Sequence, residues 1–222
     1  ESTLQSIVNY EMKYPLQKVG EKFLSKLTPT ISARYSPNQS RNKSKDDRVM
    51  DVNNIFSLNR IGFSDTVEGG QSITIGNEYS IFNNKNDNKK ILSVNLATSI
   101  RDVENKNLPI NSTLGKKNSD IFGSVEFNTN KFIDFDYNFS LDNDLHTLNS
   151  NQIKSSLSFY NFVSTFDFLE KNNEIGSNSY ISNETKLTVN ESSTFGFKTR
   201  KNKETDLTEY YNLIYEYRND CL

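Results

Sequence analysis

The sequence lacks most of the parts from which active sites are commonly built. It has one cysteine, Cys221, one histidine, His146, no tryptophan and only 9 glycines in 222 residues. A lone cysteine cannot form a disulfide within the chain, and one cysteine with one histidine cannot supply the four ligands of a structural zinc site. His146 lies in a polar loop, and no G-x-S-x-G element accompanies it. We therefore expect a protein that is not an enzyme, with no metal site and no cofactor.

Long apolar runs and an excess of charge of one sign are also absent. No run approaches the roughly 18 apolar residues of a membrane helix. The net charge is −2, with 26 basic and 28 acidic residues spread along the chain, so no nucleic-acid partner is expected. The mean hydropathy is −0.70, yet the chain has 15 Phe and 11 Tyr, which disordered chains lack. Strands of a membrane barrel alternate lipid-facing and lumen-facing residues, so low hydropathy does not argue against a membrane.

A period-two alternation of apolar and polar residues runs through almost the whole chain. Between residues 133 and 141, for example, every odd position is apolar or aromatic, whereas positions 134, 136 and 138 are Asp or Asn. A helix would mix these two sets. The pattern predicts an all-β fold, an antiparallel meander of about eleven strands. The predicted strands span residues 3–16, 24–36, 68–83, 90–101, 118–128, 131–141, 152–160, 162–170, 178–189, 191–201 and 207–219.

The connections between these strands are of two kinds. Tight turns are expected at 129–130, 161 and 190–191, and longer polar loops at 37–67, 102–117, 142–151, 171–177 and 202–206. Outer-membrane barrels have short turns on the periplasmic rim and long extracellular loops. The chain is therefore predicted to be an open part of a transmembrane outer-membrane β-barrel, with loop 37–67 either extracellular or folded into the lumen. Alternating strands also occur in soluble sandwiches and surface adhesins.

Several segments carry motifs in an order that resembles one family. Residues 60–79 resemble "R-x-x-G-x-D-R-x-E-G-G … G-x-x-Y", with Thr66 in place of the second arginine. Residues 27–37 resemble "L-x-P-x-x-x-x-x-Y-x-P", residues 123–127 and 135–142 resemble later barrel strands, and residues 215–222 resemble "Y-x-x-(D/N)-(E/D)-C-L". These are motifs of the LptD family of lipopolysaccharide-assembly, or organic-solvent-tolerance, proteins. The family loop motif falls here on Arg60, Asp65, Glu68, Gly69 and Gly70.

The resemblance implies a function without covalent chemistry. The chain would be part of the translocon that inserts lipopolysaccharide into the outer leaflet of the outer membrane of a Gram-negative bacterium. The implied partners are lipopolysaccharide, outer-membrane lipids, an LptE-type plug lipoprotein, and an LptA-type periplasmic bridge that docks on an N-terminal domain. Residues 1–222 would then be a partial barrel domain, without the N-terminal periplasmic domain and the gate strands. Cys221 would form a disulfide to a cysteine outside this segment.

The resemblance and the alternation together assign the two faces of the strands. The lumen-facing candidates are Arg34, Glu78, Asp134 and Asp136. The lipid-facing candidates are Leu96, Phe135, Tyr137 and Phe139. Other functions remain open at this point: a passive porin or substrate-specific channel is the main alternative, followed by a secreted adhesin and an outer-membrane enzyme.

Overall fold

A computed structural model describes residues 4, 6–42, 49–60, 66–84, 89–129, 132–173 and 176–218. The only helix in this part of the chain is the three-residue 3₁₀ helix η1 (Ile110–Ser112), so no described helix could cross a membrane. The strands are β1 (Val8–Lys13), β2 (Leu16–Val19), β3 (Phe23–Ser36), β4 (Arg41–Asn42), β5 (Thr66–Val67), β6 (Gly70–Asn83), β7 (Lys89–Arg101), β8 (Ile121–Asn128), β9 (Ile133–Leu141), β10 (Leu148–Phe159), β11 (Phe162–Asn173), β12 (Gly176–Asn190), β13 (Ser193–Asn202) and β14 (Leu207–Tyr217).

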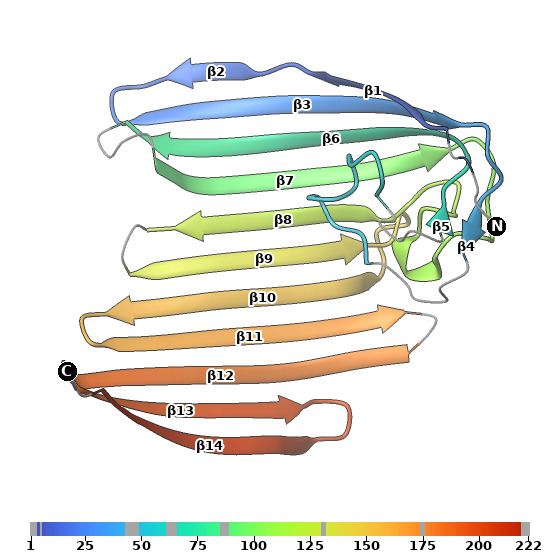
Figure 1. Cartoon of the computed structure of the whole chain (residues 1–222). Coiled ribbons are helices and arrows are strands. Elements are labelled where there is room, and N and C mark those ends of the chain that lie inside the picture. Colours follow the sequence, from blue (N-terminus) through green and yellow to red (C-terminus); the bar gives the residue numbers. More distant parts are fainter. Residues whose placement is uncertain are drawn as a thin grey trace.

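Twelve of the strands form a single antiparallel sheet. Its order is β1-β3-β6-β7-β8-β9-β10-β11-β12-β13-β14, and β2 pairs with β3 beside β1. Each strand pairs with the next long strand along the chain, so the sheet is a meander (Figure 1). The described sheet is not closed, since β14 lies at one edge and β1 and β2 lie at the other. The predicted all-β antiparallel meander is confirmed, and its open form is consistent with part of a barrel.

The first predicted strand, 3–16, is wrong in detail. The edge of the sheet is broken into β1 and β2 at Tyr14 and Pro15, which lie outside any strand. Pro15 has no N–H group to donate to the ladder, whereas the Tyr14 amide still donates to the Pro29 carbonyl at 3.1 Å. The short pair β4 and β5 lies within the segment that was expected to be a loop.

The predicted polar loop at 171–177 is also wrong. Residues 171–173 continue β11, and residues 176 and 177 begin β12, with Asn172 opposite Ser177 in the register. Polar side chains suggested a loop here, but backbone pairing does not depend on side-chain polarity. The long connections of the described sheet are therefore 37–69 and 102–120, at the same end of the strands (Figure 1).

The register gives the sheet two chemically different faces. Cross-strand partners point to the same side of a sheet. Arg34, Ser72 and Arg101 are partners across β3, β6 and β7, whereas Leu96 and Phe139 are both partners of Gly123 on β8. We call the side that carries Arg34 the polar face and the side that carries Phe139 the apolar face.

The buried apolar cluster lies on the polar face, beneath the two long connections. It joins residues of the connections to two positions on the sheet, and Val52 and Phe56 pack against it. A packed cluster of this kind holds both connections against the wall by burying apolar surface. Its buried members are Met50, Ile55, Leu108 and Leu114 from the connections and Ala97 and Phe122 from the sheet.

Candidate functional site: the polar face of the sheet

The centre of the covered part of the polar face is one carboxylate surrounded by three arginines. The Glu68 Oε2 atom accepts a hydrogen bond from Arg60 Nε at 2.8 Å, and Oε1 accepts bonds from Arg60 Nη2 at 2.5 Å and Arg101 Nη2 at 2.7 Å. Arg34 Nε lies 3.4 Å from the same Oε2. All four side chains are at least nine-tenths buried. Glu68 thus joins the loop residue Arg60 to wall residues on β3 and β7.

The remaining donors of these arginines are used by the wall and the connections. Arg60 donates to the hydroxyls of Ser72, Thr74 and Ser99 at 2.6, 3.0 and 3.1 Å. Arg101 donates to the carbonyls of Gly69 and Leu114 at 2.7 and 2.9 Å, and Arg34 donates to the Leu58 carbonyl at 2.6 Å. Because buried charges are costly unless paired and hydrogen-bonded, this network fixes both connections in one position.

Burial opposes the ionised form of Glu68, but its partners outweigh that effect. Burial raises the pKa of the Glu68 carboxyl, while the hydrogen bond from Arg60 and the charges of Arg60, Arg34 and Arg101 lower it, and the result lies below the ordinary value. Glu68 precedes β6 and lies outside the strands. It therefore remains ionised at neutral pH and balances the buried arginines.

Glycines provide the space for the close approach of the connection. A Cβ atom at Gly76 on β6 would lie 2.7 Å from the Phe56 ring, so the ring occupies a notch in the wall. A Cβ atom at Gly69 would lie 1.7 Å from the Asn38 carbonyl oxygen. Gly70 has φ +87°, a backbone conformation that side chains disfavour. Gly69 and Gly70 thus mark the point where the connection leaves the cluster and enters β6.

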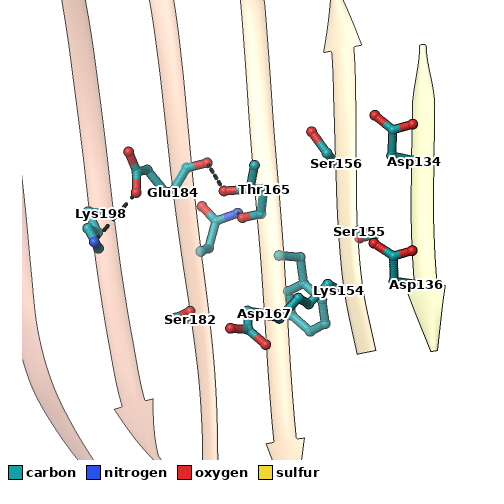
Figure 2. Close-up of a pocket in the computed structure, with 12 residues that line it drawn as sticks. Asp134, Asp136, Lys154, Ser155, Ser156, Thr165, Asp167, Ser182, Glu184 and Lys198 are labelled. Carbon is teal, nitrogen blue, oxygen red and sulfur yellow. Dashed lines mark hydrogen bonds and ion pairs between the residues drawn. The ribbon is translucent and has the colours of Figure 1, made fainter. Parts of the chain in front are cut away.

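The polar face of the later strands carries an open groove of about 390 Å³ (Figure 2). It crosses β9 to β13, and the register places nine of its lining residues on the polar face. All nine are charged or carry a hydroxyl group. They are Asp134, Asp136, Lys154, Ser156, Thr165, Asp167, Ser182, Glu184 and Lys198.

Charged side chains of the groove pair only loosely. Lys198 Nζ lies 3.5 Å from Glu184 Oε2, and Lys186 Nζ lies 2.9 Å from Glu184 Oε1, with all three side chains exposed by 31 to 52%. The Thr165 hydroxyl donates to the Glu184 carbonyl at 3.2 Å, as Figure 2 shows. Exposed pairs of this kind contribute about 0–1 kcal/mol each. The charged side chains of the groove therefore remain accessible to water or to a ligand.

The lumen-facing candidates lie in different parts of the polar face. Arg34 is 7% exposed beneath the connection, whereas Glu78 is exposed on β6 and accepts a hydrogen bond from Ser80. Asp134 and Asp136 are exposed in the groove. The structure thus brings Arg34 together with Arg60, Glu68 and the paired glycines, but it does not join them to the two aspartates.

Two further predictions concern residues 65 and 221. Asp65 of the family loop motif and Cys221 both lie outside the described residues.

Sequence reasoning missed Arg101 and the charged residues of β10 to β13. The alternation of polar and apolar residues could have located them, because Arg101, Lys154 and Glu184 all occupy polar positions of strands.

The four lipid-facing candidates lie on the apolar face. Leu96 is 46% exposed, and Tyr137 and Phe139 stack with ring centroids 5.4 Å apart. Phe139 covers Gly123, since a Cβ atom there would lie 2.1 Å from its ring. Phe135 pairs with Phe127 across β9 and β8. Covering a strand glycine with an aromatic ring supports the local pairing.

Among the described residues, no three or more His, Cys, Asp or Glu side chains are grouped so that they could hold a metal ion.

Comparison with protein-family models shows the family of the chain. The family model "LptD: LPS transport system D" matches residues 1–196, which includes β1 to β12 and the start of β13. The chain belongs to the LptD family. This family transports lipopolysaccharide to the outer membrane. The match ends before β14 and Cys221. No curated protein matches the chain at a significant level.

Proposed function

We propose that this chain forms part of the wall of the outer-membrane translocon that inserts lipopolysaccharide into the outer leaflet, without making or breaking a covalent bond. The observation that carries the proposal is the difference between the two faces of one sheet. Leu96, Phe135 and Phe139 lie on the apolar face, and a groove of charged and hydroxyl groups lies on the other. An amphiphile that meets both environments is sorted by solvation, with acyl chains in hydrocarbon and sugars in water.

The wall would act within a larger assembly in the outer membrane. The chain would be the partial barrel domain, with lipopolysaccharide as cargo and an LptE-type lipoprotein and an LptA-type bridge as partners. The long connections 37–69 and 102–120 would lie on the extracellular rim, as is usual in such barrels. Cys221 would form a disulfide with a periplasmic domain of the same protein and so restrain the motion of that domain. Cys221→Ser should abolish the mobility shift between reducing and non-reducing gels.

Depletion of the whole protein in its native cell tests the proposed function. Surface lipopolysaccharide should fall, because newly made molecules cannot reach the outer leaflet. The uptake of small polar solutes should not fall with it. Reduced solute uptake with unchanged surface lipopolysaccharide would instead indicate a passive channel and overturn the proposal.

A further inference from the structure

The apolar face has a groove of its own at the loop end of the first strands. The groove has a volume of about 640 Å³ and crosses β1, β3, β6 and β7, which lie side by side in the sheet (Figure 1). The register places six of its lining residues, all aliphatic or aromatic, on the apolar face. They are Val8, Tyr10, Ala33, Tyr35, Ile73 and Ile100. We call this hollow the apolar groove.

The hollow arises because one small residue lies between large ones. Ala33 on β3 is the partner of Tyr10 on β1 and of Ile73 on β6. Its methyl group is shorter than both neighbouring side chains, so it forms the floor of the groove and they form its sides. All three residues are exposed. If this face meets the membrane, as the proposed function requires, the groove is filled by hydrocarbon chains.

Polar side chains line the apolar groove at its loop end. They belong to Gln71, Asp102 and Lys117, and all three residues are exposed. The Arg101 amide donates to the Lys117 carbonyl at 2.7 Å, which holds Lys117 beside the end of β7. An ammonium group binds phosphate, whereas amide and carboxylate groups exchange hydrogen bonds with hydroxyl and amide groups. An apolar hollow with a few polar groups at one end is typical of ligand sites, and this one suits a phosphorylated lipid.

The width and the charges of the groove favour one class of phosphorylated lipid. Neighbouring strands lie about 4.8 Å apart, so β1 and β7 are about 14 Å apart, which suits several hydrocarbon chains side by side. The Asp102 carboxylate repels a second phosphate but accepts hydrogen bonds from hydroxyl or amide groups. A headgroup that combines phosphate with such donors, as a phosphorylated sugar does, therefore matches Lys117 and Asp102 together.

We propose that the apolar groove binds the acylated, phosphorylated sugar anchor, lipid A, of one lipopolysaccharide molecule that already lies in the outer leaflet. The proposal rests on the proposed function, because that function places the loop end of the strands in this leaflet. The bound molecule is not cargo in transit, since it lies on the outside of the wall. Lys117 would pair with its phosphate, and its acyl chains would cover Ala33.

Lipid titration of the full protein, purified in detergent and stripped of bound lipid, tests the acyl part of the site. Native mass spectrometry measures the affinity for lipid A and, separately, for phosphatidylethanolamine. In Ile73→Trp the larger side chain fills the groove. The matched control is Ile75→Trp on the same face of β6, because Ile75 and Ile73 are 47% and 48% exposed but only Ile73 lines the groove. Heat-modifiable gel migration verifies that each variant folds.

A charge reversal tests the headgroup part. Lys117→Glu removes the phosphate partner, and the control is Lys89→Glu, an exposed lysine at the other end of β7. Lys117→Glu should bind phosphorylated lipid A at least tenfold more weakly than the wild type, and Lys89→Glu should not. Lipid A from which the phosphates have been removed should bind Lys117→Glu and the wild type equally well. An equal loss with and without phosphate would overturn the role of Lys117.

We expect the wild type to bind lipid A at least tenfold more tightly than phosphatidylethanolamine, and Ile73→Trp alone of the two tryptophan variants to lose this affinity. Equal affinity for the two lipids, or equal binding by Ile73→Trp and Ile75→Trp, would overturn the site, because lipid then binds elsewhere on the protein. The depletion experiment keeps the two proposals apart. If depletion lowers surface lipopolysaccharide but the variants bind like their controls, only the lipid site fails. If depletion leaves surface lipopolysaccharide unchanged, the proposed function fails.

Discussion

The two halves of the polar face differ in the size of their side chains, and this difference determines what covers them. On β3, β6 and β7 the polar positions beneath the connections are mostly Ser, Thr, Gly or Ala, with Arg34 and Arg101 at the strand ends. On β9 to β13 the corresponding positions include Asp, Lys and Glu. Small hydroxyl-bearing residues let a connecting segment approach the backbone, whereas long charged residues hold water at the surface. The same alternation thus builds two regions on one sheet. The filled region is the loop end of β3, β6 and β7, and the open region is the groove across β9 to β13.

Removing the Glu68 carboxylate, at the centre of the filled region, should cause the largest loss in the free energy of unfolding. Glu68→Gln leaves three buried arginines without a counter-charge, and breaking a buried pair costs roughly 3–5 kcal/mol. Glu184→Gln, in the open region, should cost about 0–1 kcal/mol. Urea unfolding of the protein in detergent micelles measures both values. Equal losses would show that the two regions do not differ in the way described.

Within the open region, an arginine should cost more unfolding free energy on the apolar face of β9 than on its polar face. Phe135→Arg puts a charge on the apolar face and should cost about 2–4 kcal/mol near the bilayer midplane, whereas Asp134→Arg should cost much less. Folding into lipid vesicles, followed by urea titration, gives the two free energies. Similar tolerance at positions 135 and 134 would rule out the assigned orientation.

A methyl group added to the notch should loosen the filled region. In Gly76→Ala the new Cβ atom meets the Phe56 ring at 2.7 Å and the Leu96 carbonyl oxygen at 2.9 Å, and overpacking of this kind costs about 1–3 kcal/mol. The control is Gly196→Ala on β13, where the nearest atom lies at 3.2 Å and belongs to the Ile214 side chain. Limited proteolysis should cut the connection faster in Gly76→Ala only. Unchanged cleavage would show that Phe56 does not need the notch.

Protonation of Glu68 at low pH should destabilise the filled region. The pKa of Glu68 is lower in the folded protein than in the unfolded chain, because the charges of the arginines outweigh the effect of burial. Its stabilising contribution is therefore complete above the unfolded value of about 4.3 and is lost as the pH falls through the lower folded pKa. The difference in unfolding free energy between the wild type and Glu68→Gln should stay constant from pH 7 to pH 5 and shrink below about pH 4. A difference that does not change with pH would contradict this role.

The strands were predictable because one simple signal, the alternation, encodes them. It located the segments that became β3 and β6 to β14, since most of them have one mainly apolar side and one mainly polar side. It failed where backbone effects decide the structure, as at Pro15, and where polar residues pair through their backbones, as at residues 171–173.

The candidate site was only partly predictable. The family motif identified Arg60 and Glu68, but Arg34 and Arg101 lie 26 residues or more from Arg60 in the sequence. The register of β3, β6 and β7 brings Arg34 and Arg101 to one end of the wall, and the folded connection places Arg60 and Glu68 against them. The groove was missed as a unit, because its charges are distributed over five strands and no local pattern joins them.

Cysteine accessibility in the native membrane tests the central claim most directly, namely that the polar face is filled at the loop end of β3, β6 and β7 and open to water at β9 to β13. In the full protein with its other cysteines replaced, single cysteines are introduced at Ser182, in the groove, at Ser99, beneath the connections, and at Leu96, on the apolar face. We predict rapid labelling of position 182 by a charged, water-soluble maleimide and at least tenfold slower labelling of positions 99 and 96. Equal labelling of positions 182 and 99 would contradict the account.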